Sequence, residues 1–177
     1  DIRGSALSYL IPARRRCVYN RSWETGLPKV EMISRLVGAA DALDPELFLD
    51  DQSCREAAAV IDPQLAAGAG PGPIIALAPI AHQPGKSWPA DRWGELVGRL
   101  RAEPRFDGWR FMLVGGPGDH APAAPALQAA GERGIDCVGR GDILASAAAI
   151  DRAALFVGND SGLMHVAAAD RRPTLGL

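Results

Sequence analysis

Three loops carry the residues best suited to chemistry, and each loop follows an apolar run. The first contains Lys86, shortly before Pro89, where a helix is expected to begin. An ammonium group at that place would neutralise a phosphate, helped by the positive end of the helix dipole. The segment Gly85-Lys86-Ser87 is not a P-loop, because position 80 is Ile where that motif requires glycine. A solvated loop lysine without a ligand is the alternative interpretation.

The second loop, residues 158–162, lies between an apolar run and a short helical segment. Asp160 or Ser161 suits the N-cap of that helix, where a side-chain oxygen accepts a hydrogen bond from a first-turn N–H. Gly162 has no side chain, so a ligand can approach the backbone closely there. Free amides together with the helix dipole would favour a diphosphate at this position.

Asp160 and His165 are the charged or ionisable side chains in and just after the second loop. A carboxylate beside a diphosphate is repulsive, so Asp160 must either turn inward as a cap or be accompanied by a cation such as Lys86. His165 stands four residues after Ser161 and therefore on the same helical face. A lone helical histidine is often structural, but this face and the preceding loop favour a place near the pocket.

The third loop is Gly115-Gly116-Pro117-Gly118-Asp119-His120, which is not the G-x-G-x-x-G pattern of dinucleotide-binding proteins. Asp119 would accept a hydrogen bond from a ribose hydroxyl, or it would cap the helix expected from Pro122. His82 and His120 have no carboxylate or cysteine partner at metal-site spacing, so no metal ligand is predicted. The sequence also lacks a zinc signature, a serine-triad order and a G-x-S-x-G nucleophile elbow.

From residue 74 onward, apolar runs typical of buried strands alternate with segments whose apolar residues recur at helical spacing, and these elements would position the three loops. Strands are expected over five apolar segments, at residues 74–78, 109–114, 135–138, 154–157 and 174–177. Helices are expected between them, at residues 89–100, 122–133, 143–150 and 163–169. Such repeated units predict an α/β fold with a parallel sheet and helices on both faces. Ligands bind these sheets at the carboxyl ends of the strands, which correspond to loops 79–88, 115–121, 139–142 and 158–162.

Residues 1–70 are less regular. Helices are expected at residues 5–13, 28–40 and 52–61, and a strand at residues 17–19. The segment 66–73 is rich in Ala, Gly and Pro and is predicted to be a linker. The expected organisation is therefore residues 1–66, a linker at 67–73 and residues 74–177. Because the chain begins without Met and closes on an apolar strand, we expect an internal piece of a longer protein.

Composition narrows the classes of function. The 177 residues include 19 Lys and Arg against 21 Asp and Glu, which disfavours a protein that coats nucleic acid. The cluster Arg14-Arg15-Arg16 with Arg21 is either a solvated face or a contact with anionic lipid or an acidic acceptor. No apolar run approaches the ~18 residues of a membrane span. Three isolated cysteines without a C-x-x-C pair suit a reducing compartment.

Two segments together resemble the ADP-heptose:lipopolysaccharide heptosyltransferases, glycosyltransferase family 9. Residues 86–93 (KSWPADRW) resemble that family's K-x-W-P-x-x-x-[FWY] segment, and residues 159–169 (NDSGLMHVAAA) resemble its N-D-[TS]-G-x-x-H-x-A-A signature, the more specific match. Residues 1–5 are similar to the family's D-L-[RQ]-G-S segment, and residues 173–177 to the strand after the signature. One departure is the loop 80–84, which lacks the small hydroxyl or glycine residues that the family usually carries there.

The resemblance implies a GT-B architecture, in which two Rossmann-like domains enclose the active site. This chain would hold the end of the acceptor-side domain, the linker and most of the donor-side domain, truncated at its C-terminus. By the same resemblance, the donor-binding residues are Lys86, Asp160, Ser161 and Gly162 at the diphosphate, His165 in support, Asp119 at the ribose, and the backbone of Ile143 and Leu144 at the adenine.

The implied reaction moves a sugar, expected to be heptose from ADP-heptose, to a hydroxyl of a lipopolysaccharide-type acceptor, with no cofactor or metal. The general base is expected upstream of Asp1, so the chain alone is not expected to be active. The resemblance implies a cytoplasmic enzyme that touches the inner face of the cytoplasmic membrane and binds no nucleic acid. Two alternatives stay open: another GT-B nucleotide-sugar enzyme, such as a sugar-nucleotide 2-epimerase, and a non-catalytic nucleotide-binding module.

Overall fold

A computed structural model describes residues 29–39, 45–81 and 84–177. The chain divides into two compact units, Asp1–Pro45 and Glu46–Leu177. In the first unit, helix α2 (Lys29–Val37) confirms the helix predicted at residues 28–40. The helix predicted at 5–13, the strand at 17–19 and the arginine cluster lie outside the described residues.

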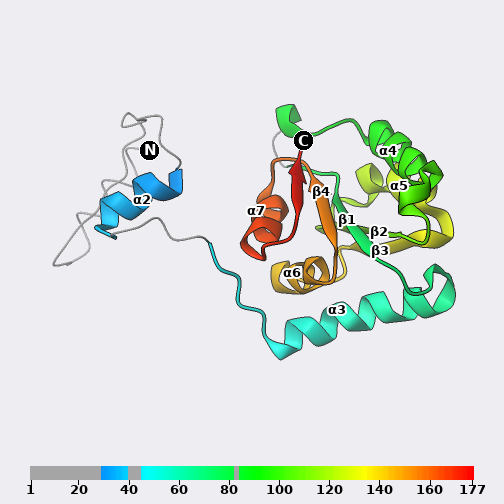
Figure 1. The fold of residues 1–177 in the computed structure, drawn as a ribbon, viewed down its shortest axis with the longest axis horizontal. Helices are drawn as coiled ribbons and strands as arrows, with labels where there is room; N and C mark the ends of the chain where they lie inside the picture. The colour runs from blue at the N-terminus through cyan, green and yellow to red at the C-terminus, as the bar shows by residue number, and fades with distance from the viewer. Residues whose placement is uncertain (1–28, 40–44, 82–83) are drawn as a thin grey trace. The chain divides into compact units, whose positions relative to one another are not determined.

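The second unit is built on a five-stranded parallel sheet with the order β3-β2-β1-β4-β5, which confirms the predicted fold class (Figure 1). Its strands are β1 (Ile74–Ala78), β2 (Arg110–Gly115), β3 (Gly134–Val138), β4 (Leu155–Gly158) and β5 (Thr174–Gly176). Every residue of β1 is buried, because the central strand of a parallel sheet is covered by helices on both faces. All five predicted strands are present.

Helices cover both faces of the sheet, as predicted (Figure 1). One face carries α4 (Ala90–Ala102) and α5 (His120–Ala130), and the other carries α3 (Asp51–Gln64), α6 (Ile143–Asp151) and α7 (Gly162–Ala169). Side chains alternate along β1, so Ile75 and Leu77 join the core under α4 and α5, while Ile74 and Ala76 join the core on the opposite face. Small residues let the second set of helices lie close to the sheet, as the buried alanines of α6 show.

The second unit begins at Glu46, well before the linker predicted at residues 67–73. Helix α3 belongs to this unit because Ala57 and Ile61 are buried in the core that also contains α6. A π-helical turn, Leu65–Ala69, follows α3 directly. The Arg110 guanidinium then donates to the carbonyls of Gly70 and Pro71, at 3.0 and 3.1 Å. In this structure the Gly- and Pro-rich segment is therefore fixed against β2 rather than separating two compact units.

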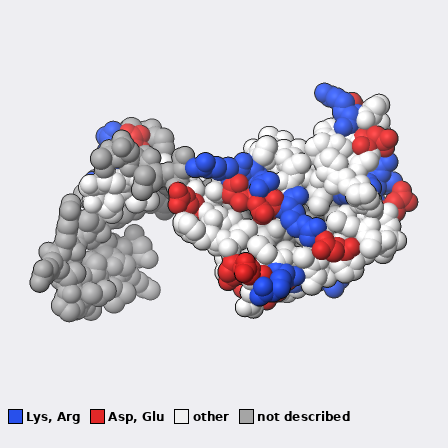
Figure 2. All heavy atoms as spheres, turned by 60° about the horizontal axis from the view of Figure 1, so that its bottom comes forward, with Lys and Arg blue, Asp and Glu red and all other residues white. Residues whose placement is uncertain are grey.

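Charged side chains of both signs lie beside one another on the face of the second unit shown in Figure 2. Ion pairs join separate elements, for example Arg152 with Asp62 at 2.6 Å and Arg172 with Asp151 at 2.7 Å. Among the described residues, no helix combines the length and the apolar character needed to cross a bilayer.

Candidate functional site

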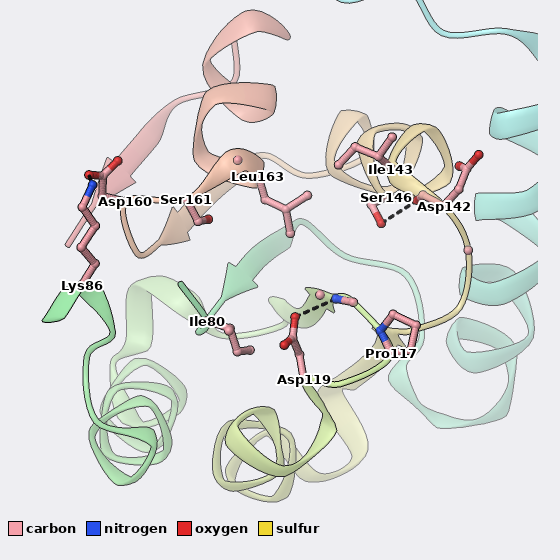
Figure 3. Close-up of a pocket in the computed structure, with 14 residues that line it drawn as sticks. Ile80, Lys86, Pro117, Asp119, Asp142, Ile143, Ser146, Asp160, Ser161 and Leu163 are labelled. Atoms are coloured by element: carbon pink, nitrogen blue, oxygen red, sulfur yellow. Dashed lines mark hydrogen bonds and ion pairs between the residues drawn. The ribbon is translucent and has the colours of Figure 1, made fainter. Parts of the chain in front are cut away.

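The carboxyl ends of the strands open into a cavity of about 600 Å³ (Figure 3), a typical size for a small-molecule site. The sheet order changes direction between β1 and β4, and ligands of such sheets bind in the crevice at that point. Residues of all four predicted loops, with the first turns of α6 and α7, form its walls: Ile80, Lys86, Gly115, Gly116, Pro117, Asp119, Gly141, Asp142, Ile143, Ser146, Asp160, Ser161, Gly162 and Leu163.

Lys86 and Asp160 meet from the loops after β1 and β4, with Lys86 Nζ 2.5 Å from Asp160 Oδ2 (Figure 3). Of the two predicted arrangements for Asp160, the structure thus shows pairing with Lys86 and not capping. The Lys86 ammonium holds the pKa of the Asp160 carboxyl below its ordinary value, first through the hydrogen bond and then through its charge. The two side chains are 44% and 45% exposed, so water screens the pair and leaves Lys86 accessible to a ligand.

The N-terminus of α7 faces the cavity without a side-chain cap. Ser161 is the N-cap residue, but among the described residues its Oγ is buried and has no hydrogen-bond partner. A Cβ added to Gly162 would meet no described atom within 4 Å, so space is open beside its amide. Amides at such a helix end, next to an unsatisfied hydroxyl and an ammonium, suit an anion.

His165 lies one turn into α7 and is 73% exposed. Its Nε2 is 3.8 Å from Asp160 Oδ1, so it contributes to the charge around Asp160. It is not among the residues that line the cavity in the described structure. His165 therefore lies beside Asp160 and not in the wall of the cavity, and its support of a ligand stays a prediction.

Asp119 occupies the N-cap position of α5, yet within the described structure its side chain makes no cap hydrogen bond. Instead Asp119 Oδ2 accepts from the Gly116 amide at 2.8 Å (Figure 3). The carboxylate comes so close to the loop that a Cβ on Gly115 would lie 3.0 Å from Oδ2. Asp119 therefore holds residues 116–119 together through Oδ2, and its side chain lies in the wall of the cavity.

Helix α6 also begins at the cavity, and its cap is an aspartate that sequence analysis did not single out. Asp142 Oδ1 accepts from the amides of Leu144 and Ala145, both at 2.9 Å. The available signal was an aspartate directly before a helical segment. Of the pair predicted for adenine, Ile143 lines the cavity, whereas Leu144 lies outside the lining and its N–H is already bonded to Asp142.

Asn159 is the second residue that the sequence interpretation missed. It is fully buried, and its side chain joins the β4–α7 loop to the loop that carries Lys86. Nδ2 donates to the Pro79 carbonyl at 2.6 Å, and Oδ1 accepts from the Trp88 amide at 3.1 Å. The Trp88 ring in turn contacts Trp93 edge to face, with centroids 5.4 Å apart. The motif contained Asn159, but the sequence could not show its partners about eighty residues away.

Within the parts of the chain that are described, no group of three or more His, Cys, Asp or Glu residues is placed to hold a metal ion. The charged groups of the cavity and the groups at the N-terminus of α7 fall into two sets. Lys86, Ser161 and the α7 amides offer positive charge and donors, and the three aspartates are each engaged with a protein group.

Comparison with known proteins supplies a family. The model of glycosyltransferase family 9 (heptosyltransferase) matches residues 28–177. Among solved structures, Escherichia coli ADP-heptose LPS heptosyltransferase II is 27% identical with a TM-score of 0.62, covering 77% of this chain and 40% of its own. A family 9 glycosyltransferase from Veillonella parvula is 21% identical with a TM-score of 0.66, covering 82% of this chain and 40% of its own.

A third structure, E. coli heptosyltransferase WaaC with ADP-2-deoxy-2-fluoro heptose, is 21% identical with a TM-score of 0.53. The match covers 82% of this chain and 42% of WaaC. The chain thus spans about two fifths of the length of these structures. No curated protein matches the chain significantly.

Proposed function

Because the chain belongs to glycosyltransferase family 9, we propose that the protein transfers a sugar from a nucleoside-diphosphate donor and that the cavity holds this donor. The observation that carries the proposal is that Lys86 and the uncapped N-terminus of α7 line the same cavity. They come from the loops after β1 and β4, the two strands between which the sheet order changes direction. That arrangement gives a diphosphate one cation, one hydroxyl and a set of backbone amides.

The chemical demand of glycosyl transfer matches these groups. As the bond between the sugar and the diphosphate breaks, positive charge builds on the sugar ring and negative charge on the departing diphosphate. Groups fixed in place before the reaction stabilise such charge most effectively, because they need no reorganisation. Lys86 and the amides of Ser161 and Gly162 would act on the departing diphosphate, with the Ser161 hydroxyl as a further donor.

The finer assignment is ADP-heptose as donor and a lipopolysaccharide-type hydroxyl as acceptor. It is supported by the likeness to E. coli ADP-heptose LPS heptosyltransferase II. In this proposal Asp119 binds the ribose and Ile143 packs against the adenine, while His165 supports the diphosphate site through Asp160. The reaction would take place in the cytoplasm, at the inner face of the membrane that carries the acceptor.

The general base would come from outside this cavity. Asp160 is paired with Lys86, Asp119 is bonded to the Gly116 amide, and Asp142 caps α6. Each of these three carboxylates is thus already held by a donor of the protein itself. This agrees with the upstream carboxylate that the family resemblance implies.

The test is an assay of the full-length protein with ADP-heptose and a heptose-deficient lipopolysaccharide core. We expect ADP release that depends on the acceptor, and an acceptor whose mass increases by one heptose. Conversion of the free nucleotide sugar to its epimer without acceptor would identify an epimerase instead. Binding of ADP-heptose with neither reaction would identify a non-catalytic module.

A further inference from the structure

Asn159 combines complete burial with two long-range hydrogen bonds to the backbone. Its side chain is 0% exposed and lies beside Asp160, at the carboxyl end of β4. The amide nitrogen donates to Pro79 O and the amide oxygen accepts from Trp88 N. A buried polar side chain is costly unless it is bonded in this way, so its presence needs a reason.

The two partners of Asn159 bracket the loop that carries Lys86. Pro79 directly follows β1, and Trp88 comes two residues after Lys86. One carboxamide therefore holds both ends of this loop against the neighbouring strand end. Inside the loop, Ser87 Oγ adds a second brace, since it donates to Ala81 O at 3.0 Å and lies 3.2 Å from Ala81 N.

We propose that Asn159 is a positioning residue for the diphosphate site: it holds the Lys86 loop so that Nζ stands at the N-terminus of α7. This inference rests on the proposed function, because it assigns Asn159 an effect through Lys86. Asn159 follows β4 and immediately precedes Asp160, so the bracket ties the ammonium to the strand end from which the α7 amides emerge. A misplacement of about 1 Å in such a group can cost about 100-fold in rate.

The carboxamide is required because one side chain must both donate and accept at fixed separation. An aspartate at this position would accept from Trp88 but would face Pro79 O with a second oxygen. An isosteric leucine would leave the Pro79 carbonyl and the Trp88 amide unpaired, which releases the loop.

The experiment is a double-mutant cycle on ADP binding, measured by calorimetry on the full-length protein. The variants are Lys86→Ala, Asn159→Leu and their combination, with Asn159→Ser as a milder replacement if the leucine variant does not fold. We expect each single variant to weaken ADP binding by about tenfold or more. In the Lys86→Ala background, the Asn159 substitution should weaken binding by less than about threefold, because its effect passes through Lys86.

Gln64 offers a matched control. Its carboxamide also bridges two elements, donating to Asp136 O at 3.1 Å and accepting from Asp136 N at 2.8 Å, but it joins α3 to β3 away from the cavity lining. Gln64→Leu should lower the melting temperature as Asn159→Leu does. It should leave ADP affinity within about twofold, the range of a change that touches no ligand contact.

The outcomes separate the inference from the function on which it rests. If Lys86→Ala binds ADP as well as the unaltered protein, the proposed diphosphate site is wrong and the inference falls with it. If Lys86→Ala weakens ADP binding but the Asn159 variants do not, only the role of Asn159 is overturned. The role of Asn159 is also overturned if the double variant loses ADP affinity by the product of the two single losses. It is overturned likewise if Gln64→Leu weakens ADP binding as much as Asn159→Leu does.

Discussion

Helices α6 and α7 both begin at the cavity and lie on the same face of the sheet, but their first turns are satisfied differently. At α6, Asp142 accepts from two amides and places a carboxylate at the positive end of the dipole. At α7, Ser161 makes no such bond in the described structure, and the adjacent Asp160 carboxylate is paired with the Lys86 ammonium. The first amides of α6 are therefore already bonded to a carboxylate, whereas the N-terminus of α7 has no side-chain cap and lies next to the Lys86–Asp160 pair.

In the proposed function, this difference would separate the two parts of a nucleoside-diphosphate sugar. The capped end of α6 would repel a phosphate, and its exposed Ile143 suits an uncharged ring. The uncapped end of α7 has amides still to be bonded and a cation beside them. A helix N-terminus at a cavity is therefore an anion site only where the protein has not already supplied the anion.

The largest effect is expected from Lys86→Ala. Without the ammonium, the α7 end keeps its amides but gains the unpaired charge of Asp160. Steady-state turnover of ADP-heptose by the full-length protein should fall by about 100-fold or more, the scale of losing one key electrostatic donor. Lys86→Arg keeps the charge and should retain more activity. An unchanged turnover rate for Lys86→Ala would contradict the proposal that the Lys86 charge makes the α7 end, and not the α6 end, the diphosphate site.

Gly162→Ala tests the amides alone. The added methyl group meets no described atom within 4 Å, so folding stability should not fall, but it occupies the space through which a diphosphate approaches. We expect ADP affinity to drop by about tenfold, or about 1.4 kcal/mol, in calorimetry. Gly98 in α4 is a matched control, since a Cβ there also meets nothing within 4 Å. Equal ADP affinity for Gly162→Ala would argue that the ligand does not approach α7.

Asp142→Ala tests the capped end. Loss of the cap should lower the free energy of unfolding by about 1 kcal/mol, measured by urea titration. ADP affinity should change by less than about twofold, because the proposed diphosphate site lies at α7 and not at α6. A large loss of ADP affinity without a loss of stability would assign Asp142 to ligand binding. It would contradict the inference that the α6 end does not hold the charged part of the ligand.

The smallest effect concerns pH. The Lys86 hydrogen bond lowers the pKa of Asp160 below its ordinary 3.8 in the folded state. The unfolded state therefore binds a proton more readily, so the pair stabilises the fold above about pH 3.8 and this contribution is lost as the pH falls through the lower folded value. Urea titrations should show a slightly weaker acid dependence below pH 4 for Asp160→Asn. Identical curves would mean that solvent removes the effect of the pair.

Local sequence patterns predicted the elements well because each pattern reports on local geometry and burial. The apolar run of β1 and the stripe containing Trp93 and Val97 in α4 depend only on which side chains must be buried. Differences lie at the ends, as in α5, which starts at His120 rather than Pro122. The helix after Phe48 was also predicted, but it was assigned to residues 1–66, whereas Ala57 and Ile61 of α3 are buried in the core that also contains α6.

The site was predictable as far as it follows from sheet topology. Parallel strands bring their following loops to one edge, so Lys86, Asp119, Ile143 and Asp160 were expected near one another and the structure places them there. The hydrogen-bond partners were not predictable. Whether Asp119 capped α5 or bonded Gly116, and whether Asn159 reached Pro79, depends on sub-ångström placement of loops.

The edge-to-face contact of Trp88 with Trp93 gives the Lys86 loop a natural fluorescent probe. Trp93 is fixed in the core with 0% exposure, whereas Trp88 is 37% exposed on the loop itself. A ligand that moved Lys86 would change the surroundings of Trp88 directly and those of Trp93 through the contact between the two rings. A change in tryptophan emission on ligand binding, lost when Trp88 is replaced by Phe, would therefore report the occupancy of the cavity without a label and before any bond is broken.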